Sequence, residues 1–345
     1  MALEFDRNFK EPHIIKATYR IVTPMFIGDA EQNATGISPQ SVKGALRFWW
    51  RALMWGEYLQ EAKQTETQAL TLLHEAEARL FGIAMDEQRG KAGKANGQGA
   101  FLLSVQQPTS LNTMADWPPK SANDGAGYLG YGLAGTKDTD PREALVEGGD
   151  FTVKLWCNAN NPYFEKYRDS LEKALRALSL FGGLGSRARR GFGSVTLVKL
   201  NNQNTLLTKS TYREEIQSLL RTFSSTKLAP YSAFSQDSNF RLFDSGKNAR
   251  DLLKAAGSEY KKFRSDLKTK HLTNARISFG LPLPNVADEE NLRRASPLLF
   301  HVHALAGDQY IASALYLPTS IFHKKANYQL INTSKVADFI MGKPA

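Results

Sequence analysis

The hydrophobic positions of the first 200 residues fall into alternating strand and helix patterns. Residues 13–23, "HIIKATYRIVT", are rich in β-branched residues and end at Pro24, and three later stretches have the same strand character: 100–107, 150–157 and 194–200. Ser38 followed by Pro39 predicts the start of a helix that runs to about Leu59, and a second long helix starts at 161–162. With a shorter helix over about 70–82, the order is βαββαβ, the ferredoxin-like arrangement that RNA-recognition domains share.

The second half follows a polar linker over 201–210 and has a different order of patterns. Helical spacing occurs over 211–223 and 248–268, a strand is expected over 275–284, and a hairpin has its arms at 297–305 and 310–317. A final short helix starts at Ser334. The fold class is therefore α+β, with an N-terminal domain over 1–200 that carries an insertion at 108–149, and a C-terminal α+β domain over 201–345.

The helix over 38–59 carries three distinct faces. At about 100° per residue, one face collects the apolar residues expected in the core, Val42, Leu46, Trp49 and Leu53. Beside it, three basic residues spaced four apart form a stripe, Lys43, Arg47 and Arg51, with Trp50 at the border. Charges on such an apolar helix need a partner, because burying an unpaired guanidinium is costly. Alternatively, the basic stems pass over the tryptophans and reach water.

A second basic segment, "FGGLGSRARRGFGSV" over 181–195, combines arginines with glycines. The glycines allow sharp turns that expose backbone N–H groups, and the arginines supply planar donors that suit phosphate: Gly182, Gly183, Gly185, Gly191 and Gly193 with Arg187, Arg189 and Arg190. The segment follows a helix and precedes a strand, which excludes a dinucleotide fingerprint. The alternative is a helix C-cap and turn with solvated arginines. Arg293 and Arg294 in "RRASPL" form a smaller phosphate-binding candidate.

Composition and charge limit the class of partner and the compartment. The formal net charge is +10, from 44 basic and 34 acidic residues, which suits nucleic acid or an anionic membrane surface, or is only a solvated basic surface. The single cysteine, Cys157, excludes an internal disulfide or a cysteine-based zinc site. Because no signal-peptide pattern or membrane-length apolar run is present, we expect a cytoplasmic protein that does not enter a membrane.

Candidate catalytic residues are few. Asp29 and Glu31, just after the first strand, could hold Mg²⁺ for strand cleavage, although solvated loop acids are the plainer interpretation. His301 and His303 share one face of a strand, where we favour a solvated hairpin face over a metal site. No HExxH or nucleophile triad is present. We therefore expect no catalytic residue, no metal and no cofactor.

Several motifs in this order resemble one known family. "TPMFIGDA", "SVKGALRFWWRAL" with "AEARLFG", "FGGLGSRARRGFGSV", and "FGLPLP" with "RRASPL" resemble the RAMP superfamily of CRISPR proteins, and within it the first-numbered subunit type of the Cmr effector complex of type III-B systems. The resemblance spans both halves, and 108–149 is its least similar part. It implies two ferredoxin-like (RRM-like) domains in one subunit of an RNA-guided, RNA-targeting complex.

The resemblance also implies roles for particular residues. The loop over 182–193 would face guide RNA, and Lys43, Arg47 and Arg51 would face the same surface. This subunit type lies where the 3′ part of the guide pairs with the target, and it is not known for cutting. A related subunit cleaves target RNA with an aspartate in the loop that here contains Asp29. RAMP nucleases that process guide RNA commonly use a histidine near the first helix, and none lies between His13 and His74.

Three hypotheses follow. The leading one is a non-catalytic RNA-binding subunit in antiviral defence, with guide RNA, target RNA and other Cmr subunits as partners. In it, an aromatic residue of the insertion, Trp117, Tyr128 or Tyr131, would stack on a base. The second is a metal-dependent endoribonuclease that uses Asp29. The third is a scaffold in which Phe48 and Trp55 meet a partner subunit.

Overall fold

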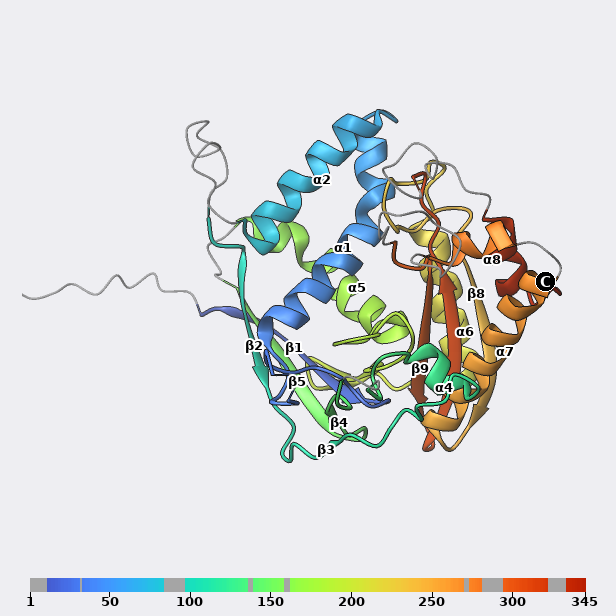
Figure 1. The fold of residues 1–345 in the computed structure, drawn as a ribbon. Coiled ribbons are helices and arrows are strands. Elements are labelled where there is room, and N and C mark those ends of the chain that lie inside the picture. The colour runs from blue at the N-terminus through green and yellow to red at the C-terminus, as the bar shows by residue number, and fades with distance from the viewer. Residues whose placement is uncertain are drawn as a thin grey trace, which may run out of the picture.

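The computed structural model describes residues 11–31, 33–83, 97–135, 139–157, 162–269, 273–280, 294–321 and 333–345. They form a mixed α/β structure with antiparallel sheets, in which two helix-covered sheets lie next to each other (Figure 1). Within these ranges, every helix is too short or too polar to cross a lipid bilayer.

The N-terminal half contains a five-stranded antiparallel sheet with the order β2-β5-β1-β6-β7. Its elements are β1 (His13–Ile21), α1 (Pro39–Glu61), α2 (Glu66–Phe81), β2 (Phe101–Gln106), β5 (Asp150–Cys157), α5 (Pro162–Phe181), β6 (Val195–Leu200) and β7 (Gln203–Asn204). β1 is central, pairing with β5 from His13↔Cys157 to Arg20↔Asp150 and with β6 on its other side. The predicted strands and helices of this half are all present, and α1 packs against α2 and α5.

The C-terminal half contains a three-stranded antiparallel sheet with the order β8-β10-β9. Its elements are α6 (Lys209–Thr222), β8 (Asn239–Gly246), α7 (Ala249–Thr269), the 3₁₀ helix η1 (Thr273–Phe279), β9 (Leu298–Leu305), β10 (Gln309–Tyr316) and α8 (Ser334–Ile340). The helices and the hairpin match the prediction, and Gly307 and Asp308 at its turn both have positive φ, as a tight hairpin turn requires. β8 has no counterpart among the predicted elements.

The strand expected over 275–284 is wrong where the structure describes it, because 275–279 lie in η1; residues 281–284 lie outside the described ranges. Consecutive residues Ile277, Ser278 and Phe279 are all buried, so the segment has no solvent-facing side of the kind that an alternating strand has. The Ser278 hydroxyl donates to the Ala275 carbonyl at 2.6 Å, which closes a local turn in place of a strand ladder.

The molecule has two hydrophobic cores, and each contains residues from both halves of the chain. One cluster joins the α1 tryptophans to Tyr212 of α6 and to Leu315 of β10. The other joins Phe26 and Phe192 of the N-terminal half to α7 and β9. Residues on both sides of residue 200 therefore contribute to each core, and the loop over 182–193 lies between them. The boundary at residue 200 stays a prediction.

The 108–149 segment is packed against the rest of the molecule. It contains β3 (Thr113–Met114), α4 (Gly125–Leu129) and β4 (Ala144–Leu145). α4 packs against α7 so closely that a Cβ atom on Gly125 would collide with the Lys254 carbonyl, and one on Gly257 would collide with the Gly125 carbonyl. The insertion is thereby joined to the C-terminal half.

Candidate nucleic-acid interface

α1 begins and packs as its sequence predicts. The Ser38 hydroxyl accepts a hydrogen bond from the Ser41 N–H at 3.1 Å, and Pro39 occupies the first turn. The expected core face is confirmed, because the following residues are buried: Val42, Leu46, Trp49 and Leu53. Trp50, placed at the border of the basic stripe, is also fully buried, and its Nε1–H donates to the Ser170 hydroxyl at 2.9 Å.

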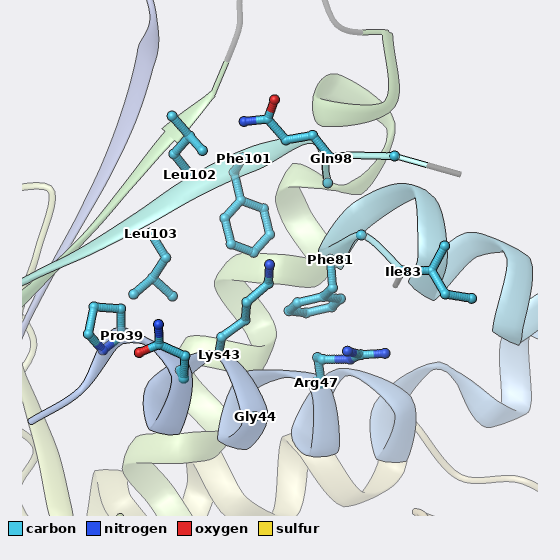
Figure 2. A pocket seen from close by; sticks show the side chains of 14 residues that line it. Pro39, Lys43, Gly44, Arg47, Phe81, Ile83, Gln98, Phe101, Leu102 and Leu103 are labelled. Carbon is cyan, nitrogen blue, oxygen red and sulfur yellow. The ribbon is translucent and has the colours of Figure 1, made fainter. Parts of the chain in front are cut away.

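The basic stripe on α1 has a buried acidic partner. The Arg47 Nε–H donates to Glu77 Oε1 at 2.7 Å, and the Arg51 Nε lies 3.8 Å from the same oxygen. Glu77 belongs to α2 and is only 3% exposed, whereas both arginine side chains reach solvent in part. Glu77 stands between two buried alanines of α2, Ala76 and Ala78, which is the local sign that this carboxylate is buried, although the sequence does not show which cation it meets. Lys43, one turn before Arg47, lines a cavity (Figure 2).

The glycines of the 182–193 loop allow it to pack tightly. Gly185 has a φ of +86°, and a Cβ atom there would collide with the Phe26 carbonyl. Gly193 has a φ of +59°, and a Cβ atom there would collide with the Leu184 carbonyl. The Ser186 N–H donates to the Phe26 carbonyl at 2.7 Å, and the Gly193 N–H donates to the Pro24 carbonyl at 2.9 Å. These two amides are therefore used inside the protein, where they hold the loop against the segment that follows β1.

The remaining glycines of the loop are also closely packed. A Cβ atom on Gly182 would lie 2.7 Å from the Trp49 Nε1, and one on Gly183 would lie 2.7 Å from the Gly193 carbonyl oxygen. Gly191 has a φ of +84° and faces Leu253 of α7, whose Cδ1 would lie 2.5 Å from an added Cβ. The glycines thus allow the loop to pack at the same time against α1, against its own residue Gly193 and against α7.

The three loop arginines are held by neutral groups. The Arg187 guanidinium donates to the Tyr131 carbonyl at 2.6 Å, and that of Arg190 donates to the Tyr260 hydroxyl at 3.0 Å. Arg189 donates to the Ser296 carbonyl at 3.0 Å. Within the described ranges, none of the three forms an ion pair with a carboxylate.

Burial and mutual repulsion act on this arginine cluster. Burial, with smaller contributions from Arg294 and Arg190, lowers the pKa of Arg189 to about 10. Burial first, and then nearby arginines, also lowers the pKa of Arg187, and burial lowers that of Arg294. The three loop arginines still stay cationic at neutral pH, so their positive charges lie close together without a carboxylate partner among the described residues. An external anion would remove this repulsion.

Arg189 brings together three segments that the sequence singled out separately. Its guanidinium carbon lies 4.9 Å from the ring centroid of Phe48 on α1, and its hydrogen bond to Ser296 reaches the "RRASPL" segment. The Arg189 carbonyl also accepts the Phe300 N–H of β9 at 2.9 Å. The Gly/Arg loop, α1 and the segment with Arg294 therefore meet at one place. Arg293 lies outside the described residues.

One of the three aromatic candidates in the insertion is free to contact a ligand. Trp117 packs against Phe192 with ring centroids 5.2 Å apart, and Tyr128 is packed beside Tyr260 at 6.0 Å. Tyr131 is 69% exposed, and its carbonyl is the acceptor for Arg187. An exposed aromatic residue is therefore joined to the arginine cluster through its backbone carbonyl.

The carboxylate of Asp29 is engaged by a nearby residue, Asn33. Its Oδ1 accepts the Asn33 N–H at 2.9 Å, and its Oδ2 lies 3.5 Å from the Asn33 side-chain amide, as in a turn stabilised by aspartate. Among the described residues, no group of three or more His, Cys, Asp or Glu side chains could hold a metal ion.

The interpretation of His301 and His303 as a solvated hairpin face is wrong, because both are 1% exposed. The Nδ1 of His301 lies 2.9 Å from the Gly182 carbonyl, and that of His303 lies 3.1 Å from the Ser179 carbonyl. Since β9 is covered on both faces, neither side of the strand meets water. Burial lowers the pKa of His303 to about 3 and that of His301 well below its ordinary value, so both rings are neutral and act as donors beneath the start of the loop.

Comparisons with known proteins agree with the resemblance seen in the motifs. The chain is 28% identical to the CRISPR system Cmr subunit Cmr1-1 of Pyrococcus furiosus over 78% of this chain and 77% of that one. It is 26% identical to Cmr1-2 of the same organism over 52% of this chain and 92% of the relative.

Solved structures show the same fold. The crystal structure of Cmr1 from Pyrococcus furiosus in its apo form superposes with a TM-score of 0.64 at 22% identity, covering 96% of both chains. A chain from the cryo-EM structure of the type III-B Cmr-beta complex bound to cognate target RNA gives a TM-score of 0.55 at 12% identity, covering 96% of this chain and 98% of that one. The family profile of the RAMP superfamily matches residues 18–196, more than half of the chain. The chain therefore belongs to the RAMP superfamily, and its predicted resemblance to the first-numbered Cmr subunit is confirmed.

Proposed function

We propose that this chain is a non-catalytic, RNA-binding subunit of a type III-B Cmr effector complex in the cytoplasm. It contacts the 3′ part of the guide RNA and the target RNA paired with it, and it assembles with other Cmr subunits in antiviral defence. The names of its relatives support membership in a Cmr complex, and the RNA-bound Cmr-beta structure supports RNA as the ligand. The strand order β2-β5-β1-β6 supports a ferredoxin-like N-terminal domain, with a second such domain proposed for the C-terminal half.

The observation that carries this proposal is the arginine cluster around Arg189. Arg187, Arg189 and Arg190 have no acidic partner among the described residues and repel one another. A phosphate backbone would supply the missing anions, and guanidinium groups fit phosphate oxygens with paired donors. Tyr131, whose carbonyl accepts a hydrogen bond from Arg187, adds an exposed aromatic residue to this surface. Because the cluster is a loop surface and not a pocket, we expect readout of backbone and shape and not of base sequence.

The absence of catalysis is part of the proposal. Both Asp29 oxygens face Asn33, which supports a structural role for this carboxylate. The scaffold alternative has less support, since Trp55 is fully buried and its Nε1–H donates to the Lys227 carbonyl at 2.8 Å. Phe48 is covered by Arg189. Neither ring is a free contact for a partner subunit.

The test compares RNA binding by two variants of equal charge. Arg187→Ala/Arg189→Ala/Arg190→Ala removes the cluster, and Arg168→Ala/Arg213→Ala/Arg221→Ala removes three exposed arginines of α5 and α6. Fluorescence anisotropy of labelled single-stranded RNA over a salt series should show that the loop variant lowers the slope of log K against log [salt] by about 2, at about 0.7 per phosphate contact. The control variant should keep the slope. An unchanged slope in the loop variant would remove the basis of the proposal.

The same protein preparations test for cleavage. Labelled RNA incubated with the wild-type protein and Mg²⁺ should stay intact. Cleavage that is present in the wild type and lost in Asp29→Ala would replace the proposal with the endoribonuclease hypothesis.

A further inference from the structure

A cavity of about 610 Å³ lies beside the first turns of α1 (Figure 2), and none of the described residues that line it belongs to the 182–193 loop. α1 forms its floor, and the C-terminal end of α2, the segment 97–99 and β2 form its walls. The volume is in the range of small-molecule sites, which is about 300–1,000 Å³. The lining residues are Pro39, Gln40, Lys43, Gly44, Arg47, Phe81, Gly82, Ile83, Gly97, Gln98, Gly99, Phe101, Leu102 and Leu103.

Two glycines in this lining face open space. A Cβ atom on Gly44 or on Gly97 would meet no described residue within 4 Å, and neither glycine has a positive φ. This differs from the 182–193 loop, where the fold has no room for a side chain. Gly44 lies inside a helix, where alanine would be more stable. The packing of the protein therefore does not explain Gly44, but a ligand that approaches the α1 backbone would.

The charge of the cavity is positive and only partly balanced. Among the described residues, its lining contains Lys43 and Arg47 and no acidic side chain. Glu77 pairs with Arg47, while Lys43 has no ion pair among the described residues. Burial, followed by repulsion from Arg47, lowers the pKa of Lys43, which shows that its ammonium group is partly removed from water without an anion beside it. The positive end of the α1 dipole adds to this field.

The remaining lining suits a flat polar ring. Figure 2 shows the Lys43 side chain extending from α1 toward Phe101, with Phe81 on one side, Leu103 on the other and Gln98 at the upper edge. Inorganic phosphate would leave the apolar walls unused, and a fatty acyl chain would leave the amides of Gln40 and Gln98 without partners. A phosphate joined to a heterocyclic base uses the cation, the walls and the amides together.

We propose that this cavity binds a single unstacked nucleotide of an RNA strand, with its phosphate at the Lys43 ammonium group and its base against the apolar walls. The inference rests on the proposed RNA-binding function and adds a second contact to it, separate from the arginine cluster. Gly44 is then the residue that lets the nucleotide approach α1.

The test is a calorimetric titration of the chain of residues 1–345 with uridine 5′-monophosphate as the probe. The wild type should bind it, uridine and inorganic phosphate should each bind at least about tenfold more weakly, and Lys43→Gln should weaken binding at least about tenfold. Lys199→Gln, an exposed lysine on β6, is the matched control and should bind like the wild type. Failure of the wild type to bind the monophosphate overturns the inference.

Gly44→Ala and Gly44→Leu separate ligand binding from folding. Both replace a helical glycine, so the melting temperature should rise by about 1–2 °C, while Gly44→Leu, whose side chain enters the cavity, should abolish nucleotide binding. Opposite changes in stability and binding are expected only if the space at Gly44 serves a ligand. If Gly44→Leu binds the nucleotide normally, the cavity is not the site.

Two further arms identify the source of the nucleotide and separate this inference from the proposed function. Single-stranded RNA should displace the monophosphate, and Gly44→Leu should weaken RNA binding about tenfold, the effect of losing one stacked base. Displacement that fails would identify a free nucleotide as the ligand and overturn the RNA assignment. The loop variant Arg187→Ala/Arg189→Ala/Arg190→Ala should still bind the monophosphate. If it loses RNA affinity while the wild type never binds the monophosphate, the proposed function stands and only this inference fails.

Discussion

The molecule contains two groups of arginines that look equivalent in the sequence and differ in the structure. Arg47 and Arg51 of α1 share one oxygen of the buried Glu77. The arginines of the 182–193 loop are held by two carbonyls, a hydroxyl and aromatic rings. Both groups were predicted to bind phosphate. The two groups therefore differ in charge balance: Arg47 and Arg51 have a carboxylate partner, whereas the loop arginines have none among the described residues, and RNA binding by either group stays a prediction.

The largest expected effect tests the α1 pair. Arg47→Ala/Arg51→Ala leaves the Glu77 carboxylate buried without its partners, so the free energy of unfolding should fall by about 3–5 kcal/mol, as when one side of a buried ion pair is removed. Urea denaturation measures this. Adding Glu77→Gln removes the stranded charge and should restore most of the loss. A double variant that unfolds like the wild type but binds RNA poorly would show that these arginines act on RNA as the loop arginines do.

An intermediate effect on the free energy of unfolding is expected when the pH is lowered, because His303 lies buried beneath the start of the 182–193 loop. The pKa of His303 lies near 3 in the folded protein and near 6.5 when unfolded, so the unfolded chain binds the extra proton. The stability that this histidine contributes is complete above about pH 6.5 and is lost as the pH falls toward 3; between pH 7 and 5 the loss is about 2 kcal/mol. Chemical denaturation over this pH range should show the decrease.

A control for the acid effect is His303→Gln, which keeps an N–H donor but does not titrate. This variant should be less stable at pH 7 and less sensitive to pH. Equal pH sensitivity in the variant and the wild type would assign the acid effect to other groups.

The smallest expected effect is on RNA affinity, and it comes from substitutions that keep the positive charge and change only the shape of the side chain. Arg189→Lys keeps the charge but loses the planar guanidinium that lies over Phe48 and reaches Ser296. RNA affinity should fall about fivefold, or about 1 kcal/mol. Arg47→Lys is the matched change in α1 and should leave RNA affinity within twofold of the wild type. An equal loss of RNA affinity in both variants would show that the loop arginines and the α1 arginines do not differ in this respect.

Local patterns predicted the local structure well. The Ser38 cap, the apolar face of α1 and the hairpin turn at Gly307–Asp308 depend on neighbours within a few residues, and the structure contains all three. The partner of Arg47 and Arg51 could not be located in this way, because Glu77 is 30 residues from Arg47 and its burial depends on how α2 packs.

Features that depend on how the two halves meet were also beyond the sequence patterns. His301 and His303 alternate correctly along a strand, but the strand is covered on both faces, so alternation carried no information about solvent. The role of the loop glycines in close packing appears only when α1, α7 and the segment after β1 are placed around them. The meeting of the loop with Phe48 and Ser296 is likewise a property of the assembled cores.

The contact between Arg189 and Ser296 joins residues that are 107 positions apart. Contacts of such long sequence separation require a large loop to close, so they form after the local helices and hairpins. During synthesis on the ribosome, the arginine cluster consequently cannot reach its final arrangement until β9 has emerged, although all three loop arginines have been made about a hundred residues earlier. The newly made N-terminal half would thus carry the basic loop in an unfinished form, and the proposed RNA-binding surface would be complete only after β9 has been made.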